Sequence, residues 1–257
     1  MSELENGHQN DMMAVSVSLH ESEVIVKARR RSLLVVRRLV MLVLLAVAWL
    51  RVLASSEPPA PPEEEAELRT ATELFRRAAS HRINGEIFVR GTRALVPWLD
   101  RLGGGLSSLV LVNVRKLEVA GVLDLEPVLA TERRDGRFEK DDSATTATLW
   151  NGRVLGFIAR FLDEILEADS LNTDLSLAAR AAYKATLERH HPLYVRTAAR
   201  AILSRLPDAR TLFENRLGYP PDTWDTRLRA DLDSLKTALD TFLIALKAAL
   251  QRHDHVL

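Results

Sequence analysis

Apolar side chains recur at helical spacing through successive segments between residue 68 and the C-terminus. Breakers such as Gly103, Pro207 and Pro220 lie between several of the segments. None of the segments shows the two-residue alternation of a half-buried strand. The expected helices cover residues 68–81, 86–102, 106–121, 124–134, 144–168, 175–190, 193–205, 208–216 and 222–252. The sequence therefore predicts an all-α domain over 68–257, with too many helices for a simple four-helix bundle.

The composition excludes several classes of function. The chain has 35 basic and 35 acidic residues, so no overall positive potential indicates nucleic-acid binding. It has no cysteine, which excludes disulfides, thiolate metal sites and cysteine nucleophiles. An enzyme built on His190, His191 and Glu188 is disfavoured, because adjacent residues on a helix point about 100° apart and no HExxH motif occurs. We therefore expect no enzymatic activity, no metal and no cofactor.

The N-terminal part divides into three segments of different composition. Residues 1–26 are polar and lack periodicity, which indicates disorder. Residues 27–54 combine a basic cluster with the apolar run LVMLVLLAVAWL at 39–50. This pattern favours an uncleaved signal anchor, with a cleaved signal peptide and an ordinary buried helix as alternatives. Residues 55–67 are rich in proline and glutamate and predict an extended linker.

The flanking charges predict how such an anchor is oriented. Basic residues precede the apolar run and acidic residues follow it, so the positive-inside rule places the N-terminus in the cytoplasm. The protein would then be a single-pass membrane protein whose helical domain faces the lumen or the cell exterior. If the apolar segment is not a signal, the domain is cytosolic.

A histidine pair lies in the middle of the helical pattern at 181–207. Pro192 follows the pair, and a proline inside a helix costs about 3 kcal/mol, so the helix should break there. We therefore expect His190 and His191 at a helix junction that faces the interior. This pattern alone is compatible with two interpretations: histidines that are part of the core, and histidines that bind a ligand.

Four motifs in order resemble the glycolipid transfer protein family, which includes the ceramide-1-phosphate transfer proteins. They are LVPWLDRLGG at 95–104, NVRKLEV at 113–119, TLWNGRVLGFIARFLDEIL at 148–166 and AYKATLERHHPLYVRTAARAILSRLP at 182–207. The resemblance implies a two-layer sandwich of about eight helices around a pocket for the hydrocarbon chains of a sphingolipid. It also implies transfer of that lipid between membranes without covalent chemistry.

The resemblance further implies a set of head-group contacts. His191 stands where the family has a histidine that hydrogen-bonds the ceramide amide. Trp150 stands where the glycolipid-binding branch has a tryptophan that stacks on the first sugar, and Arg153 keeps register with the same pattern. The phosphate-binding branch has arginines at the positions of Thr146 and Trp150. The resemblance therefore slightly favours a glycosphingolipid over ceramide-1-phosphate.

One family feature is missing from this chain. The family carries an aspartate followed four residues later by asparagine or lysine, a spacing that places both on one helical face. In one alignment Asn113 takes the aspartate position and Leu117 that of its partner; in the other, Lys116 matches the lysine and Val112 replaces the acid. The expected head-group residues are Asn113, Lys116, Trp150, Arg153 and His191. The missing acid leaves an alternative: a membrane-anchored helical scaffold or lipid sensor with a degenerate pocket.

The expected partners are a sphingolipid and a membrane surface, and we expect the protein to act as a monomer. Trp98 and Trp224, together with nearby arginines, are candidates for docking on the membrane. Leu193 stands where many relatives carry a tryptophan shortly after the histidine, which removes one such candidate.

Overall fold

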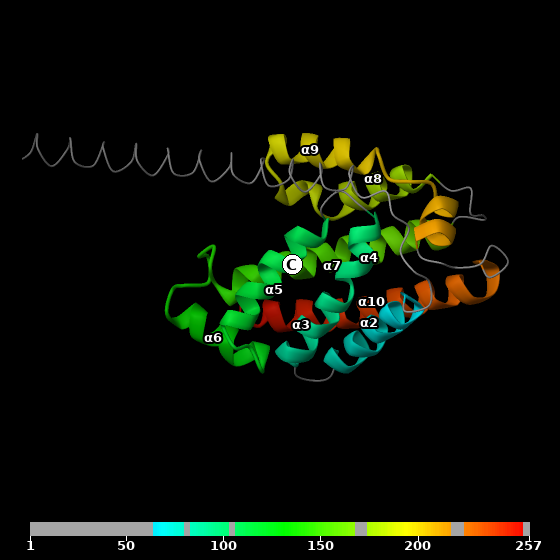
Figure 1. Cartoon of the computed structure of the whole chain (residues 1–257). Helices are drawn as coiled ribbons and strands as arrows, with labels where there is room; N and C mark the ends of the chain where they lie inside the picture. Colours follow the sequence, from blue (N-terminus) through cyan, green and yellow to red (C-terminus); the bar gives the residue numbers. More distant parts are fainter. Residues whose placement is uncertain (1–63, 80–82, 103–105, 168–173, 217–223, 254–257) are drawn as a thin grey trace, which may run out of the picture. The chain divides into compact units, whose positions relative to one another are not determined.

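A computed structural model of the chain describes residues 64–79, 83–102, 106–167, 174–216 and 224–253 (Figure 1). All of them belong to one compact unit, Arg51–Leu257. The predicted segments 1–26 and 27–54, and residues 55–63 of the predicted linker, lie outside the described residues. Within the described ranges, no helix combines the length and the apolar character needed to cross a bilayer. The membrane anchor and its orientation therefore stay predictions.

The described residues form nine α-helices and no β-strand. The helices are α2 (Glu64–Ala78), α3 (Gly85–Ala94), α4 (Val96–Leu102), α5 (Leu106–Val119), α6 (Leu125–Arg134), α7 (Ala144–Leu166), α8 (Leu175–Ala185), α9 (Leu193–Leu203) and α10 (Arg229–Gln251). Short turns of other helix types are η1 (Glu188–His190), η2 (Thr211–Arg216) and η4 (Trp224–Leu228). The prediction of an all-α fold is confirmed, with nine α-helices in this part of the chain where about eight were expected.

The first two predicted helices have different bounds in the structure. Helix α2 begins at Glu64, inside the segment predicted as linker. The helix predicted over 86–102 is two helices, α3 and α4, which meet at Leu95. Pro97 explains this break, because its ring conflicts with the carbonyl group of Arg93 and it has no amide hydrogen to donate. Proline is tolerated in the first turn of α4, where amide hydrogens have no partner within the helix.

Helix α7 is the centre of the unit. Helices α5, α6, α8 and α10 all contact it. Figure 1 shows α8 and α9 on one side of α7, and α10 with α2 on the other. None of the 23 residues of α7 is exposed. Residues on α7 therefore meet another helix on almost every face, and their side chains are positioned by packing.

Two side chains fix the N-terminus of α7. Ser143 is the N-cap, and its hydroxyl accepts a hydrogen bond from the amide of Thr146 at 3.0 Å. The carboxylate of Glu132 on α6 accepts from the amides of Ala144 and Thr145 at 2.9 and 2.8 Å. These acceptors satisfy amide hydrogens that have no partner within the helix, and the negative charge interacts favourably with the helix dipole.

Aromatic side chains join the helices on both sides of the core. The ring of Phe242 on α10 lies 5.3 Å from that of Phe75 on α2 and 5.0 Å from that of Phe88 on α3. The ring of Trp98 on α4 lies 6.5 Å from that of Phe161 on α7. Trp98 is only 1% exposed, so the suggestion that it docks on a membrane is wrong. The side chain of Trp224 lies outside the described residues.

The start of α3 passes close to the turn between α5 and α6. The amide of Gly85 donates to the carbonyl of Leu123 at 3.0 Å. A Cβ atom at Gly85 would lie 2.6 Å from the carbonyl oxygen of Val122. That oxygen belongs to the backbone, so any larger side chain here has to displace the whole turn.

Replacing Gly85 with alanine should therefore lower the free energy of unfolding by about 1–3 kcal/mol through overpacking. Gly156→Ala is the matched control, since a Cβ atom there meets no atom within 4 Å. In the middle of α7 that change should raise the free energy of unfolding by up to about 1 kcal/mol. Urea denaturation of both variants measures the difference, and equal stabilities would contradict the close approach at Gly85.

Candidate functional site

A break in the chain between α8 and α9 carries His191. The helix predicted over 175–190 ends at Ala185, and η1 follows it. His191 then has an extended backbone, with φ −102° and ψ 138°. Pro192 is the N-cap of α9, and its carbonyl accepts from the amides of Val195 and Arg196. The expected helix junction at the histidine pair is confirmed.

Side chains from α7 and α8 surround the imidazole of His191. Its ring stacks on that of Trp150 on α7, with centroids 5.4 Å apart and planes inclined by 16°. The hydroxyl of Tyr183 on α8 lies 2.8 Å from Nδ1 of His191. The rings of Tyr183 and His191 are 5.7 Å apart. The position and plane of the imidazole are therefore determined by two helices that are distant in sequence from each other.

Arg153 completes the cluster around Trp150. Its guanidinium carbon lies 5.1 Å from the centroid of the Trp150 ring, within range of a cation–π interaction. Its Nε atom is buried and has no hydrogen-bond partner among the described residues. Burial lowers the pKa of Arg153, and the nearby charge of Arg189 adds to the effect. A buried donor of this kind requires an acceptor, which can be an oxygen of water or of a bound molecule.

The two histidines are neutral in an electropositive environment. Burial, together with the nearby Arg153, Arg189 and His191, lowers the pKa of His190 to about 4. Burial likewise lowers the pKa of His191, together with Arg153 and Arg196. His190 accepts a hydrogen bond from Nε of Arg189 at 3.0 Å, which requires an unprotonated Nε2. Neutral imidazoles therefore lie among several guanidinium groups.

The other charged groups of the junction already have partners. Arg196 donates from Nε to the carbonyl of His191 at 2.7 Å. Arg200 on α9 forms an ion pair with Glu188. An enzyme built on the histidine pair would use the carboxylate of Glu188, but this carboxylate is already paired with Arg200.

The remaining two predicted site residues lie on α5, which packs against α7. Lys116 donates from Nζ to the backbone carbonyl of Asp141, in the loop that precedes α7. Asn113 is partly buried on the same helix. The structure thus brings Trp150, Arg153 and His191 into one cluster, whereas it ties Lys116 to the α6–α7 loop. Head-group roles for Asn113 and Lys116 stay predictions.

Sequence reasoning missed Tyr183 as a site residue and treated it as part of an apolar stripe. Tyr183 precedes His191 by about two helical turns, but the helix stops between them, so helical spacing does not predict their contact. It also missed two buried polar residues on α7, Thr148 and Asn151. Their side chains have no hydrogen-bond partner among the described residues.

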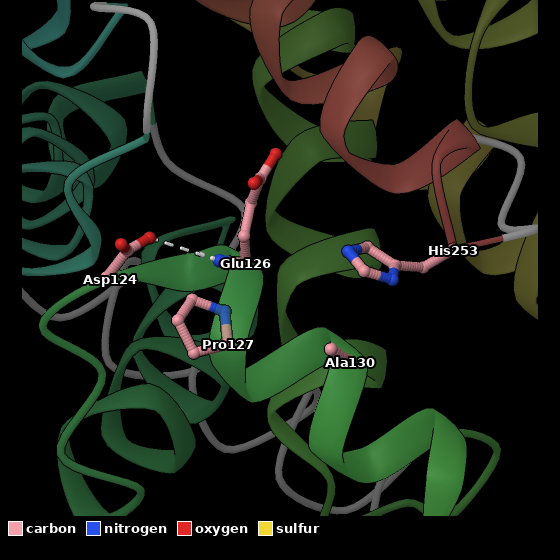
Figure 2. A pocket seen from close by; sticks show the side chains of 5 residues that line it. All are labelled: Asp124, Glu126, Pro127, Ala130 and His253. Atoms are coloured by element: carbon pink, nitrogen blue, oxygen red, sulfur yellow. Dashed lines mark hydrogen bonds between the residues drawn. The ribbon is translucent and has the colours of Figure 1, made fainter.

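A separate open pocket of about 260 Å³ lies between α6 and the end of α10 (Figure 2). Its lining consists of Asp124, Glu126, Pro127, Ala130 and His253. Asp124 caps α6 by accepting from the amide of Glu126 at 3.3 Å, and Glu126 pairs with Arg252. Both acids thus have structural partners, and the described residues include no group of three or more His, Asp or Glu side chains that could hold a metal ion. None of the predicted head-group residues lines this pocket.

Comparisons with known proteins match most of the described unit. The family model described as "Glycolipid transfer protein (GLTP)" matches residues 83–217. The pleckstrin homology domain-containing family A member 8 of Danio rerio is 28% identical over 175 residues, which are 62% of this chain and 31% of that protein. The chain thus spans less than a third of that relative's length.

Solved structures share the fold. A mutant of Arabidopsis accelerated-cell-death 11 complexed with C12 ceramide-1-phosphate matches with a TM-score of 0.66 and 16% identity over 72% of this chain and 95% of that one. The apo form of mouse ceramide-1-phosphate transfer protein matches with a TM-score of 0.60 and 20% identity, over 72% of this chain and 94% of that one. FAPP2, described as selecting simple glycosphingolipids with this fold, matches with a TM-score of 0.52 and 25% identity, over 68% of this chain and 90% of that one.

The neutral state of His190 predicts a pH-dependent stability. The folded-state pKa of about 4 lies below the ordinary value of 6.5, so between these values the unfolded chain binds more protons. The free energy of unfolding should therefore be highest above pH 6.5 and fall as the pH drops towards about 4. His190→Gln should flatten this dependence, because glutamine does not titrate and can still accept from Arg189. Urea denaturation at a series of pH values measures it.

His253→Gln is the matched control for that experiment, because it replaces the same residue type at the end of α10. If the free energy of unfolding of His190→Gln changes with pH as steeply as that of the wild-type protein, His190 does not cause the pH dependence.

Proposed function

The chain belongs to the glycolipid transfer protein family, and on this basis we propose that it binds a sphingolipid and transfers it between membranes. The observation that carries the proposal is the cluster of Trp150, Arg153 and His191, which unites a flat aromatic ring, a buried unpartnered donor and a neutral imidazole. No group in the cluster is arranged to break a covalent bond, so the proposed activity is transfer without chemistry.

The hydrocarbon chains would lie beneath α9, between this helix and the packed pair of α7 and α8. Burial of each methylene group of the lipid is worth about 0.8 kcal/mol. On α7, the parallel rings of Phe157 and Phe161 are buried and apolar, and Phe161 also contacts Trp98 on α4. On the other side, α9 buries only Leu203 completely, while Val195 and Ile202 stay partly exposed. Because so little of α9 is buried, this helix can shift at low cost and admit an acyl chain, while α8 stays packed on α7.

The cluster fits a sugar head group better than a phosphate. The ring of Trp150 is partly exposed and offers an apolar surface for stacking, and Arg153 offers a donor for a hydroxyl oxygen. A phosphate monoester favours several charge-assisted partners. Two of the nearby arginines are already engaged: Arg196 by the carbonyl of His191 and Arg200 by Glu188. We therefore propose a glycosphingolipid in preference to ceramide-1-phosphate.

Asn113 stands where the family carries an aspartate, and this difference supports a second candidate function. An asparagine loses the charge assistance that a carboxylate gives to hydrogen bonds with sugar hydroxyls. A domain that binds lipid too weakly for transfer would act as a membrane-associated scaffold or lipid sensor. Native mass spectrometry separates the two: co-purified sphingolipid supports a carrier, and a clean lipid-free mass supports the scaffold.

The end of the unit that carries His191 is the part we propose to face the membrane. Leu193, the first residue of α9, is 76% exposed although it is apolar. Arg189 beside it is exposed and positively charged, which suits anionic lipid head groups. A lipid that leaves the site next to His191 would pass directly into a bilayer at this edge.

Replacing the two aromatic ligand contacts should slow transfer of fluorescent glucosylceramide between vesicles. His191→Leu removes a hydrogen bond to the lipid, and Trp150→Ala removes the stacking surface; each should lower the rate about tenfold. His253→Leu makes the same chemical change at the end of α10 and should leave the rate unchanged. Unchanged transfer in His191→Leu would overturn the site, and faster transfer of ceramide-1-phosphate than of glucosylceramide would overturn the sugar preference.

A charge on the proposed docking edge should weaken membrane binding. Leu193→Glu should lower partitioning onto vesicles with anionic lipid about tenfold, because it removes apolar burial and adds repulsion. Ile244→Glu is the control, since Ile244 is 72% exposed on α10. Vesicle sedimentation measures both variants, and equal losses would argue against a docking edge at α9.

A further inference from the structure

Tyr183 is almost completely buried, yet its hydroxyl group is polar. The residue lies on α8 and is 3% exposed. Its hydroxyl meets Nδ1 of His191 at 2.8 Å, and this is the one hydrogen bond that the described residues give it. Buried hydroxyl groups require a partner, so the contact determines where the proton between the two groups resides.

Two arrangements of that proton are chemically possible. In the first, the hydroxyl of Tyr183 donates to an unprotonated Nδ1, and His191 carries its proton on Nε2. In the second, a protonated Nδ1 donates to the hydroxyl oxygen, and the hydroxyl hydrogen needs another acceptor. The described residues supply no such acceptor, so the second arrangement leaves a buried donor unsatisfied.

The charge states of both groups agree with the first arrangement. Burial raises the pKa of Tyr183, and Glu188 adds to this effect, so the phenol keeps its proton. Burial lowers the pKa of His191, so the imidazole carries a single proton. A neutral imidazole with its acceptor nitrogen towards Tyr183 presents an N–H group on the opposite edge of the ring.

That opposite edge is available to a ligand. Among the described residues no group hydrogen-bonds Nε2 of His191. Stacking on Trp150 fixes the plane of the ring, with 16° between the two planes. The N–H direction is therefore set by contacts on two other sides of the ring before any lipid arrives, which reduces the ordering cost of binding.

We propose that Tyr183 is a positioning residue, whose hydroxyl holds His191 in the Nε2-protonated tautomer so that the imidazole donates to a carbonyl oxygen of the bound lipid. The inference rests on the proposed sphingolipid site. In the other tautomer, His191 would present a lone pair to that oxygen and repel it. Tyr183 thus contributes to recognition of the lipid amide without touching the lipid.

Nitrogen-15 NMR of the full chain tests the tautomer without any ligand. The His191 signals are assigned by their loss in His191→Gln. The expected spectrum shows a protonated Nε2 and an unprotonated Nδ1, and a protonated Nδ1 in the wild-type protein would overturn the proposal. This measurement holds even if the protein binds no sphingolipid, so it fails or succeeds independently of the proposed function.

Tyr183→Phe keeps the ring and removes only the hydroxyl group. It should give a mixture of His191 tautomers and weaken binding of fluorescent glucosylceramide about fivefold to tenfold. Tyr194→Phe makes the same change on α9, where the ring is exposed, and should leave the tautomer and the affinity unchanged. A wild-type tautomer or a wild-type affinity in folded Tyr183→Phe would overturn the positioning role, because a purely structural tyrosine alters neither.

Discussion

The central position of α7, which has no exposed residue, is the constraint on which the rest of the structure depends. Four helices contact it, none of its 23 residues is exposed, and Glu132 and Ser143 satisfy the amides at its start. A helix enclosed in this way can present polar chemistry only where a neighbouring layer leaves space. The break between α8 and α9 provides that space, and Trp150 and Arg153 lie on α7 opposite it.

Local electrostatics at this break differ from those of the chain as a whole. The chain has equal numbers of basic and acidic residues, yet several arginines gather around the histidine pair. Most of these arginines are engaged by nearby groups, and burial together with their charge lowers the pKa of both imidazoles. A neutral imidazole and the buried Nε of Arg153 therefore lie side by side, and this pairing is the basis of the proposed preference for uncharged polar oxygens over a phosphate.

The site and its covering layer differ in rigidity. Trp150 stands on the most buried helix, and Tyr183 is fixed on α8, so the imidazole between them has little freedom. Helix α9 buries a single residue completely and has an exposed leucine at its start. The proposed lipid transfer needs this combination, because the head group must be recognised by groups already in place while the acyl chains enter beneath a helix that can shift.

The amino-acid sequence alone determined the helical class, most helix boundaries and the break at Pro192, because periodicity, proline and glycine act over a few residues. It also indicated the family, and three of the residues that it named as head-group contacts lie together in the structure. Only the tertiary structure decided that Trp98 is buried, that Lys116 binds the α6–α7 loop and that Tyr183 reaches His191. These contacts join segments across a helix break or between separate helices. Their geometry follows from how α5, α7 and α8 pack together, and no local pattern of residues encodes that packing.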